Sequence, residues 1–192
     1  MADYFDSEFD EHLVVAGATK AKLRGAFDEV AAAWLKCIKS GNKILFFGNG
    51  GSAADAQHLA TELTIRYKKD RAPIAALALT VDSSALTAAG NDIGFERIFS
   101  RQIEALGKPG DVAVGITTSG RSPNVIEALS AARRMGLVTV ALTGGAGGET
   151  ARVADHVLLV PSAVTARIQE MHIALGQMLC GKLEIDLGLA SR

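Results

Sequence analysis

The stretch that decides the fold of this 192-residue chain is residues 48–62, which read GNGGSAADAQHLATE. It follows the apolar run of residues 44–47, which is typical of a buried parallel strand, and its second half has the periodicity of a helix. Three glycines between strand and helix allow a tight turn, and Ser52 is the expected N-cap, whose neighbouring amides would face a bound anion. The stretch therefore predicts a strand, an anion-binding turn and a helix in direct succession.

The predicted helix carries two residues with catalytic chemistry. Four positions advance an α-helix by about 400°, so His58 and Glu62 share one face. A base or a pair of metal ligands is therefore expected beside the anion pocket.

Length and composition exclude several classes of protein. A chain of 192 residues favours one domain, and 48% hydrophobic with 21% charged residues is ordinary for a globular protein. A net charge of -1 does not indicate binding to nucleic acid or to a membrane surface. No long apolar run and no basic, then apolar, leader is present, so we expect a cytoplasmic location. Cys37 and Cys180 are expected to be buried free thiols.

Strands and helices alternate along the rest of the chain. Strands are predicted at 75–79, 112–117, 138–142 and 156–160, and helices at 83–89, 95–106, 123–135 and 165–187. With the first strand this predicts an α/β fold, a doubly wound sheet of five parallel strands with helices on both faces. A dinucleotide site is disfavoured because GNGGSA lacks the GxGxxG spacing.

The first 40 residues form a helical extension before the α/β core of residues 41–192. A helix is predicted over 3–39, with a break near Gly17 or Gly25 and apolar residues at helical spacing up to Ile38. An apolar stripe on a helix has to be buried against another surface. Two alternatives stay open: it packs on another subunit, or it covers its own sheet.

A second polar loop, TTSGRS, follows the predicted strand at 112–117. Its hydroxyls gather at the start of a helix, an arrangement that can hold a phosphate without a basic patch. Such residues also cap helices routinely, which is the plainer alternative. The loop at 90–92 presents Asn91 and Asp92, which either reach a ligand from the side or only form a turn.

The last predicted helix carries two glutamines and a histidine. Gln169 and Gln177 lie about 80° apart on a regular helix, whereas His172 points about 140° away from Gln177. These three side chains cannot all face one pocket.

Together, GNGGSAADAQH, the GND ending at Asp92, TTSGRSPN and RIQEMH resemble the phosphoheptose isomerases (sedoheptulose 7-phosphate isomerases) of the sugar isomerase (SIS) domain superfamily. The resemblance covers nearly the whole chain. It implies a single SIS domain over 1–192 with a three-layer α/β/α fold, and a homotetramer with active sites at subunit interfaces. The implied activity converts sedoheptulose 7-phosphate to D-glycero-D-manno-heptose 7-phosphate through an enediol, for lipopolysaccharide or capsule precursors.

The resemblance also implies roles for individual residues. Glu62 is the expected catalytic base, and position 177, a glutamine here, is the second catalytic position. The implied zinc ligands are His58, Glu62, Gln169 and Gln177. The implied substrate-binding residues are Asn49, Gly50, Gly51, Ser52, Glu62, Asn91, Asp92, Thr117, Thr118, Ser119, Ser122 and Gln169.

Gln177 departs from the family pattern, because similar enzymes have a histidine there that binds zinc and acts as acid and base. Glutamine coordinates only through an amide oxygen and cannot transfer protons near neutral pH, so we expect a weaker zinc site and a slower enzyme. Two alternatives are a non-catalytic SIS-domain tetramer that binds a protein partner, such as a replication initiator, and a sugar-phosphate sensor. The retained pair of His58 and Glu62 favours the enzyme.

Overall fold

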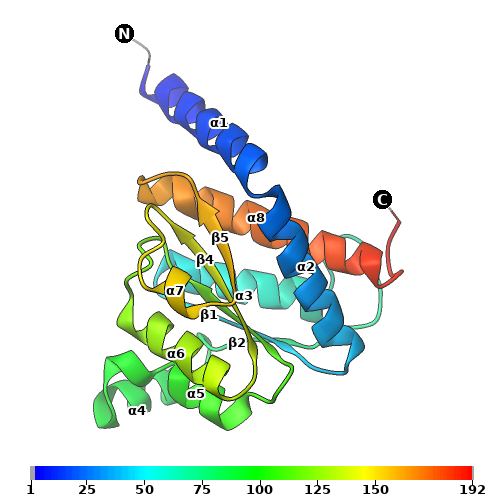
Figure 1. The fold of residues 1–192 in the computed structure, drawn as a ribbon, viewed down its shortest axis with the longest axis vertical. Helices are drawn as coiled ribbons and strands as arrows, with labels where there is room; N and C mark the ends of the chain where they lie inside the picture. Colours follow the sequence, from blue (N-terminus) through cyan, green and yellow to red (C-terminus); the bar gives the residue numbers. More distant parts are fainter. Residues whose placement is uncertain (1–2, 192) are drawn as a thin grey trace.

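A five-stranded parallel sheet lies between two layers of helices in the computed structural model, which describes residues 3–191 (Figure 1). The strand order is β2-β1-β3-β4-β5, and every pairing is parallel. The strands are β1 Ile44–Gly48, β2 Ala76–Ala78, β3 Val112–Ile116, β4 Val138–Gly144 and β5 His156–Val160. The predicted doubly wound sheet and three-layer fold are therefore confirmed.

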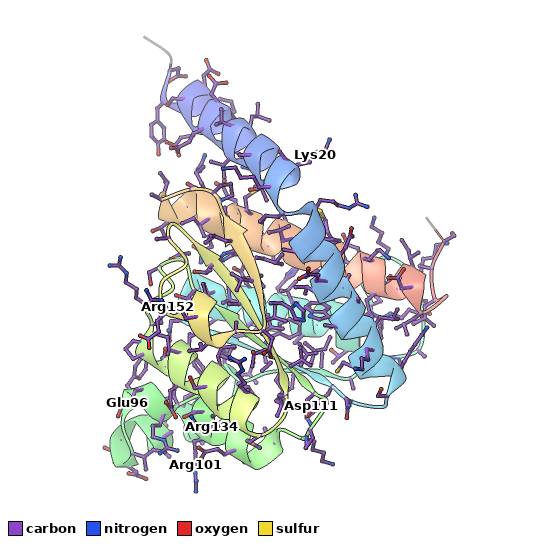
Figure 2. The ribbon with its side chains drawn as sticks, viewed as in Figure 1. Lys20, Glu96, Arg101, Asp111, Arg134 and Arg152 are labelled. Atoms are coloured by element: carbon purple, nitrogen blue, oxygen red, sulfur yellow. The ribbon has the colours of Figure 1, made fainter. Side chains whose placement is uncertain are left out.

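The helices divide between the two faces of the sheet. One layer contains α2 (Arg24–Lys39), α3 (Gly51–Thr64) and α8 (Thr165–Asp186), with α1 (Tyr4–Lys22) beyond it. The other contains α4 (Ser83–Asp92), α5 (Ser100–Leu106), α6 (Pro123–Arg134) and α7 (Thr150–Val153). Charged side chains such as Lys20, Arg101 and Arg152 lie on the outside (Figure 2).

Alternating side chains of β1 join the sheet to both layers. Ile44 and Phe46 belong to the core on the α2, α3 and α8 side, whereas Leu45 and Phe47 belong to the core under α5 and α6. All four are fully buried, and each such side chain stabilises the fold by about 1.5–3 kcal/mol. The ring of Trp34 packs edge-on against Phe46 at 5.5 Å between centroids, which fixes α2 on the sheet.

The two N-terminal helices meet at Leu23, close to the expected break at Gly25. The buried residues of α2 cover the chain's own sheet. In contrast, α1 projects beyond the body of the molecule and leaves a row of large apolar side chains exposed: Tyr4, Phe5, Phe9, Leu13 and Val14.

Three local expectations are wrong. Residues 90–92 are not a loop, because α4 continues to Asp92. The helix expected over 95–106 is divided into a 3-10 turn, Phe95–Arg97, and α5, since Gly94 with φ of 100° turns the chain just before it. The short helix α7 was not expected after the glycine-rich loop. Cys37 and Cys180 are buried and free, as predicted.

The strand order places two loops side by side. From β1 the chain goes to β2 on one side, and it then returns to β3 on the other side of β1. The loops after β1 and β3 therefore meet at the carboxyl edge of the sheet, where doubly wound folds bind ligands. No helix within residues 3–191 is long and apolar enough to cross a membrane.

Candidate functional site

The turn after β1 is built without the predicted cap. Helix α3 begins at Gly51 with Gly50 as its N-cap residue, at a φ of 57° and with no side-chain cap. Ser52 instead lies buried in the first turn, so its predicted capping role is wrong. A Cβ at Gly48 would lie 2.8 Å from the Ser52 Cβ and 2.6 Å from the Ile116 carbonyl oxygen, so this close packing requires a glycine.

The same turn receives a side chain from the far end of the sequence. A Cβ at Gly51 would lie only 2.0 Å from the Gln169 Nε2 atom. The amide of Gln169, on α8, therefore covers the backbone of Gly51. The structure thus brings together two predicted substrate-binding positions that lie more than a hundred residues apart.

A cluster of three polar side chains joins α3 to α8. The His58 Nε2 atom lies 2.9 Å from the Glu62 Oε1 atom and 3.1 Å from the Gln177 Nε2 atom. The side chain of His58 is 45% exposed and that of Glu62 is 17% exposed, so both remain open to a ligand. His58 and Glu62 share one helix face as predicted, and position 177 belongs to the same cluster.

His172 is absent from this cluster, in agreement with the helical geometry. It is fully buried on the sheet side of α8, and burial lowers the pKa of its imidazole to about 4. A neutral, enclosed ring cannot replace a histidine at position 177.

The hydroxyl loop after β3 is preorganised by contacts within itself. The Thr117 Oγ1 atom lies 3.0 Å from the Ser122 Oγ atom and 3.5 Å from the Ser119 Oγ atom, and the amide of Arg121 donates to the Ser119 hydroxyl. Ser122 precedes α6 but its hydroxyl does not cap that helix. Thr118, Ser119 and Arg121 line a hollow of about 220 Å³. The hydroxyls are thus not occupied by helix capping, which favours the ligand-binding interpretation of the loop.

A pair of amides connects the two loops. Asn49 donates to the Asn124 Oδ1 atom at 2.8 Å, and Asn124 donates back to the Asn49 Oδ1 atom at 2.9 Å. Asn124 is 2% exposed, so this reciprocal contact is shielded from water. Sequence reasoning missed Asn124 as a site residue, although a polar residue directly after the loop, in the first turn of α6, was the available signal.

Asn91 and Asp92 lie apart from these groups within one chain. Both are exposed at the end of α4, and Asn91 donates to the Asp92 carboxylate at 2.7 Å. In the described part of the chain no hydrogen bond links them to the two loops or to the polar cluster. Their contact with substrate therefore stays a prediction.

Asp55 is a further acidic group on α3 that the sequence analysis did not single out. Burial raises the pKa of its carboxyl to about 6, against a smaller opposing influence of His58. One carboxylate oxygen is buried without a hydrogen-bond partner among the described residues. Its position three residues before His58, on the same helix, was the signal for it.

The metal-binding chemistry of the site is limited. Among residues 3–191 no three His, Cys, Asp or Glu side chains gather as a metal site requires. The predicted set contains one imidazole, one carboxylate and two amides.

Comparison with known proteins identifies the family. The SIS domain model matches residues 9–144. The phosphoheptose isomerase of Paramagnetospirillum magneticum is 57% identical over 183 residues, 95% of each chain. The structure of a phosphoheptose isomerase from Neisseria gonorrhoeae is 45% identical, with a TM-score of 0.90 over 94% of this chain and 97% of that one. That of a phosphoheptose isomerase from Francisella tularensis is 36% identical, with a TM-score of 0.93 over 96% and 100%. The chain therefore belongs to the phosphoheptose isomerase family of SIS-domain proteins.

Proposed function

We propose that this chain is a ketose-aldose isomerase that converts sedoheptulose 7-phosphate to D-glycero-D-manno-heptose 7-phosphate. The observation that carries the proposal is the Glu62 carboxylate, which is partly exposed and lies beside His58 and Gln177 at the junction of α3 and α8. Family membership over nearly the full length supports the substrate. A protein that only binds a partner has no chemical need for a carboxylate and an imidazole on one helix face.

The reaction requires groups that bind the phosphoryl group and a base near the reacting carbons. The hydroxyls of Thr117, Ser119 and Ser122, with the amides at the start of α6, suit three phosphoryl oxygens. Glu62 is suited to take the proton from C1, and the electrons of the broken C–H bond then form the double bond of the enediol. Return of the proton to C2, with a proton moved from the C1 hydroxyl to the C2 oxygen, gives the aldose.

Zinc is proposed as the cofactor, held by His58, Glu62, Gln169 and Gln177. The His58 Nε2 atom already faces the other two members of the polar cluster, and rotation of the Gln177 amide would present its oxygen in place of the nitrogen. These donors fit a zinc ion, although less strongly than a set with two imidazoles. A bound zinc ion would supply electrophilic polarisation of the substrate carbonyl.

Gln177 limits the chemistry that the chain's own residues perform. An amide neither accepts nor releases a proton near neutral pH, so the proton exchange between the two sugar oxygens lacks a second acid-base side chain. General acid-base catalysis by one group contributes about 10²- to 10⁴-fold. The proposed enzyme is therefore slower than a relative with histidine at this position.

A homotetramer and a cytoplasmic location complete the proposal. The exposed apolar side chains of α1, such as Phe5, Phe9 and Leu13, need a partner in water, and a second copy of the chain provides the same face. Assembly would also add residues of neighbouring subunits around the exposed His58.

The proposal is tested by incubating the purified protein with sedoheptulose 7-phosphate, with and without added zinc, and following the heptose product. Glu62→Gln should abolish turnover while the assembly stays intact, since the amide has no basic oxygen. Turnover that is equal in both proteins removes Glu62 from the role of base. Binding of the substrate without product formation by the unaltered protein supports a sensor instead.

A further inference from the structure

A buried arginine closes the end of the helix that carries Glu62. Arg71 lies in the loop after α3, and its guanidinium donates to the backbone carbonyls of Glu62 at 2.6 Å and Leu63 at 2.8 Å. Further bonds reach the carbonyls of Ile65 and Ala72. The last carbonyls of a helix have no partner within the helix, so this one side chain supplies partners for the final turn of α3.

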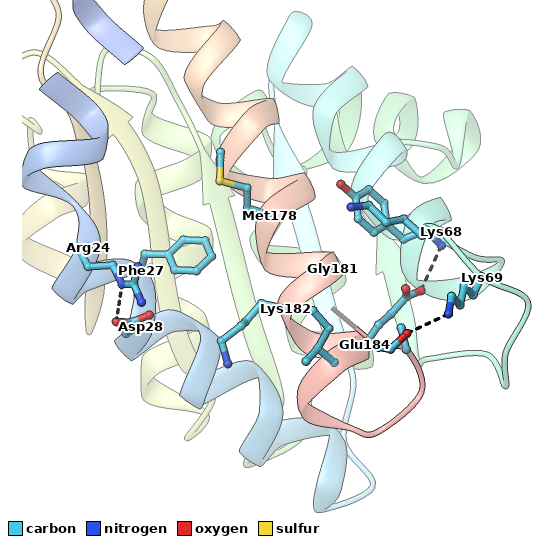
Figure 3. A pocket seen from close by; sticks show the side chains of 13 residues that line it. Arg24, Phe27, Asp28, Lys68, Lys69, Met178, Gly181, Lys182 and Glu184 are labelled. Atoms are coloured by element: carbon cyan, nitrogen blue, oxygen red, sulfur yellow. Dashed lines mark hydrogen bonds and ion pairs between the residues drawn. The ribbon is translucent and has the colours of Figure 1, made fainter. Parts of the chain in front are cut away.

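Glu184 ties the same guanidinium to α8. The Arg71 Nε atom donates to the Glu184 Oε1 atom at 2.8 Å, and the amide of Tyr67 donates to the same oxygen at 3.2 Å. The side chains of Arg71 and Glu184 are only 2% and 1% exposed. A buried ion pair holds its geometry because either charge left alone is costly. Figure 3 shows Glu184 on α8, beside the loop that carries Lys68 and Lys69.

Two glycines of α8 let α3 and the loop that follows it approach α8 closely near this ion pair. A Cβ at Gly176 would lie 2.6 Å from both methyl groups of Leu59, and a Cβ at Gly181 would lie 2.8 Å from the ring of Tyr67. The contact at Gly176 limits the separation of α3 and α8, and the contact at Gly181 places the loop after α3 against α8. The hydrogen bonds of Arg71 fix where the last turn of α3 sits along α8.

Glu62 and Gln177 lie on these two helices, and both contact the His58 ring. We propose that Arg71, held by Glu184, is a positioning residue that aims the Glu62 carboxylate by fixing the backbone carbonyl of Glu62 itself. This inference rests on the proposed role of Glu62 as the base. Arg71 touches no reacting atom and acts only through the backbone of α3.

The test compares kcat and KM of the purified full chain with those of Arg71→Lys and Glu184→Gln. Lysine retains a charge opposite Glu184 but cannot reach the set of carbonyls that a guanidinium spans, so kcat should fall about 10- to 100-fold, as expected when a catalytic group moves by about 1 Å. KM should change little because the hydroxyl loop is untouched. Glu184→Gln keeps an acceptor for Arg71 and for the amide of Tyr67, and should retain more kcat than Arg71→Lys.

Asp111→Asn is the matched control. Asp111, just before β3, is also a buried carboxylate, 1% exposed and bonded to Lys43 and to two backbone amides, and among the described residues none of its side-chain bonds reaches α3 or α8. All proteins are assayed well below their unfolding transitions, with the folded fraction measured by circular dichroism. An unchanged kcat per folded Arg71→Lys molecule, or an equal fall in Asp111→Asn, overturns the positioning role.

Glu62→Gln separates this inference from the proposed function. If that variant stays active, the role of Glu62 as base fails together with the inference. If it is inactive while Arg71→Lys keeps full kcat, only the positioning inference fails.

Discussion

We expect the buried His172 to make the fold sensitive to mild acid. Its side chain is 0% exposed on α8, and neither ring nitrogen has a hydrogen-bond partner of normal geometry among the described residues. Burial lowers the pKa of the imidazole from 6.5 to about 4, while a weaker interaction with the backbone of Thr143 acts in the opposite direction. The unfolded chain therefore binds a proton at pH values where the folded chain does not.

The magnitude follows from these two pKa values. A group with a folded pKa below its unfolded value contributes stability above pH 6.5 that is lost as the pH falls toward 4. Between pH 7.5 and pH 5 the loss from His172 alone is about 2 kcal/mol, which is a large part of a typical stability of about 5–15 kcal/mol. Other ionisable groups also titrate in this range, so the contribution has to be isolated by substitution.

The assay is urea unfolding of the unaltered protein and of His172→Leu at pH 7.5, 6 and 5, at one fixed protein concentration. Leucine fills a similar volume and does not titrate. We expect the free energy of unfolding to fall by about 2 kcal/mol less in the variant than in the unaltered chain over this interval. An equal fall in both proteins would refute the assignment of the acid sensitivity to this ring.

Three other substitutions test the site and its loops. Gln177→His should increase both zinc retention, measured by metal analysis of the purified protein, and kcat, by about 10²-fold or more; no change in either contradicts the placement of residue 177 in the site. Asn124→Ala removes the partner of the half-buried Asn49 amide, so it should cost about 1–3 kcal/mol in urea unfolding and raise KM. An unchanged KM would separate this bridge from substrate binding. Gly120→Ala should destabilise the chain by more than about 1 kcal/mol in thermal unfolding, because φ is 66° and the new Cβ would lie 2.1 Å from the Gly147 carbonyl oxygen. An unchanged stability would show that the backbone of this loop adjusts without cost.

Local patterns predicted most of the fold and the relative placement of a few candidate site residues. Apolar runs such as residues 44–47 mark parallel strands because both faces of the sheet are covered. The four-residue spacing of His58 and Glu62 predicted that both side chains share one face of a helix. The angle of about 140° between His172 and Gln177 excluded His172 from the cluster on helical geometry alone.

Other contacts between distant segments could not be predicted from local patterns. Ser52 is of a residue type that often caps helices, but the N-cap is Gly50, two residues earlier, and Ser52 lies buried against Gly48 in the first turn of α3. Asn124 and the ion pair of Arg71 with Glu184 have their roles only because segments far apart in the chain meet in the fold. For Arg71 nothing local distinguishes it from an ordinary surface arginine, whereas Asn124 had only the weak signal of its place after the hydroxyl loop.

The site divides its tasks between different elements of the fold. The loops after β1 and β3 are joined by the amide bridge of Asn49 and Asn124 at the carboxyl edge of the sheet, and they suit the phosphoryl group. In the proposed mechanism the proton transfer falls to Glu62 on α3, and Gln177 on α8 joins the same cluster through His58. A change at position 177 should therefore alter the chemical step and leave the binding of the phosphoryl group intact. Its effect is expected in kcat rather than in KM. Comparing the two constants for Gln177→His and Asn124→Ala tests this division directly, because the first should move mainly kcat and the second mainly KM.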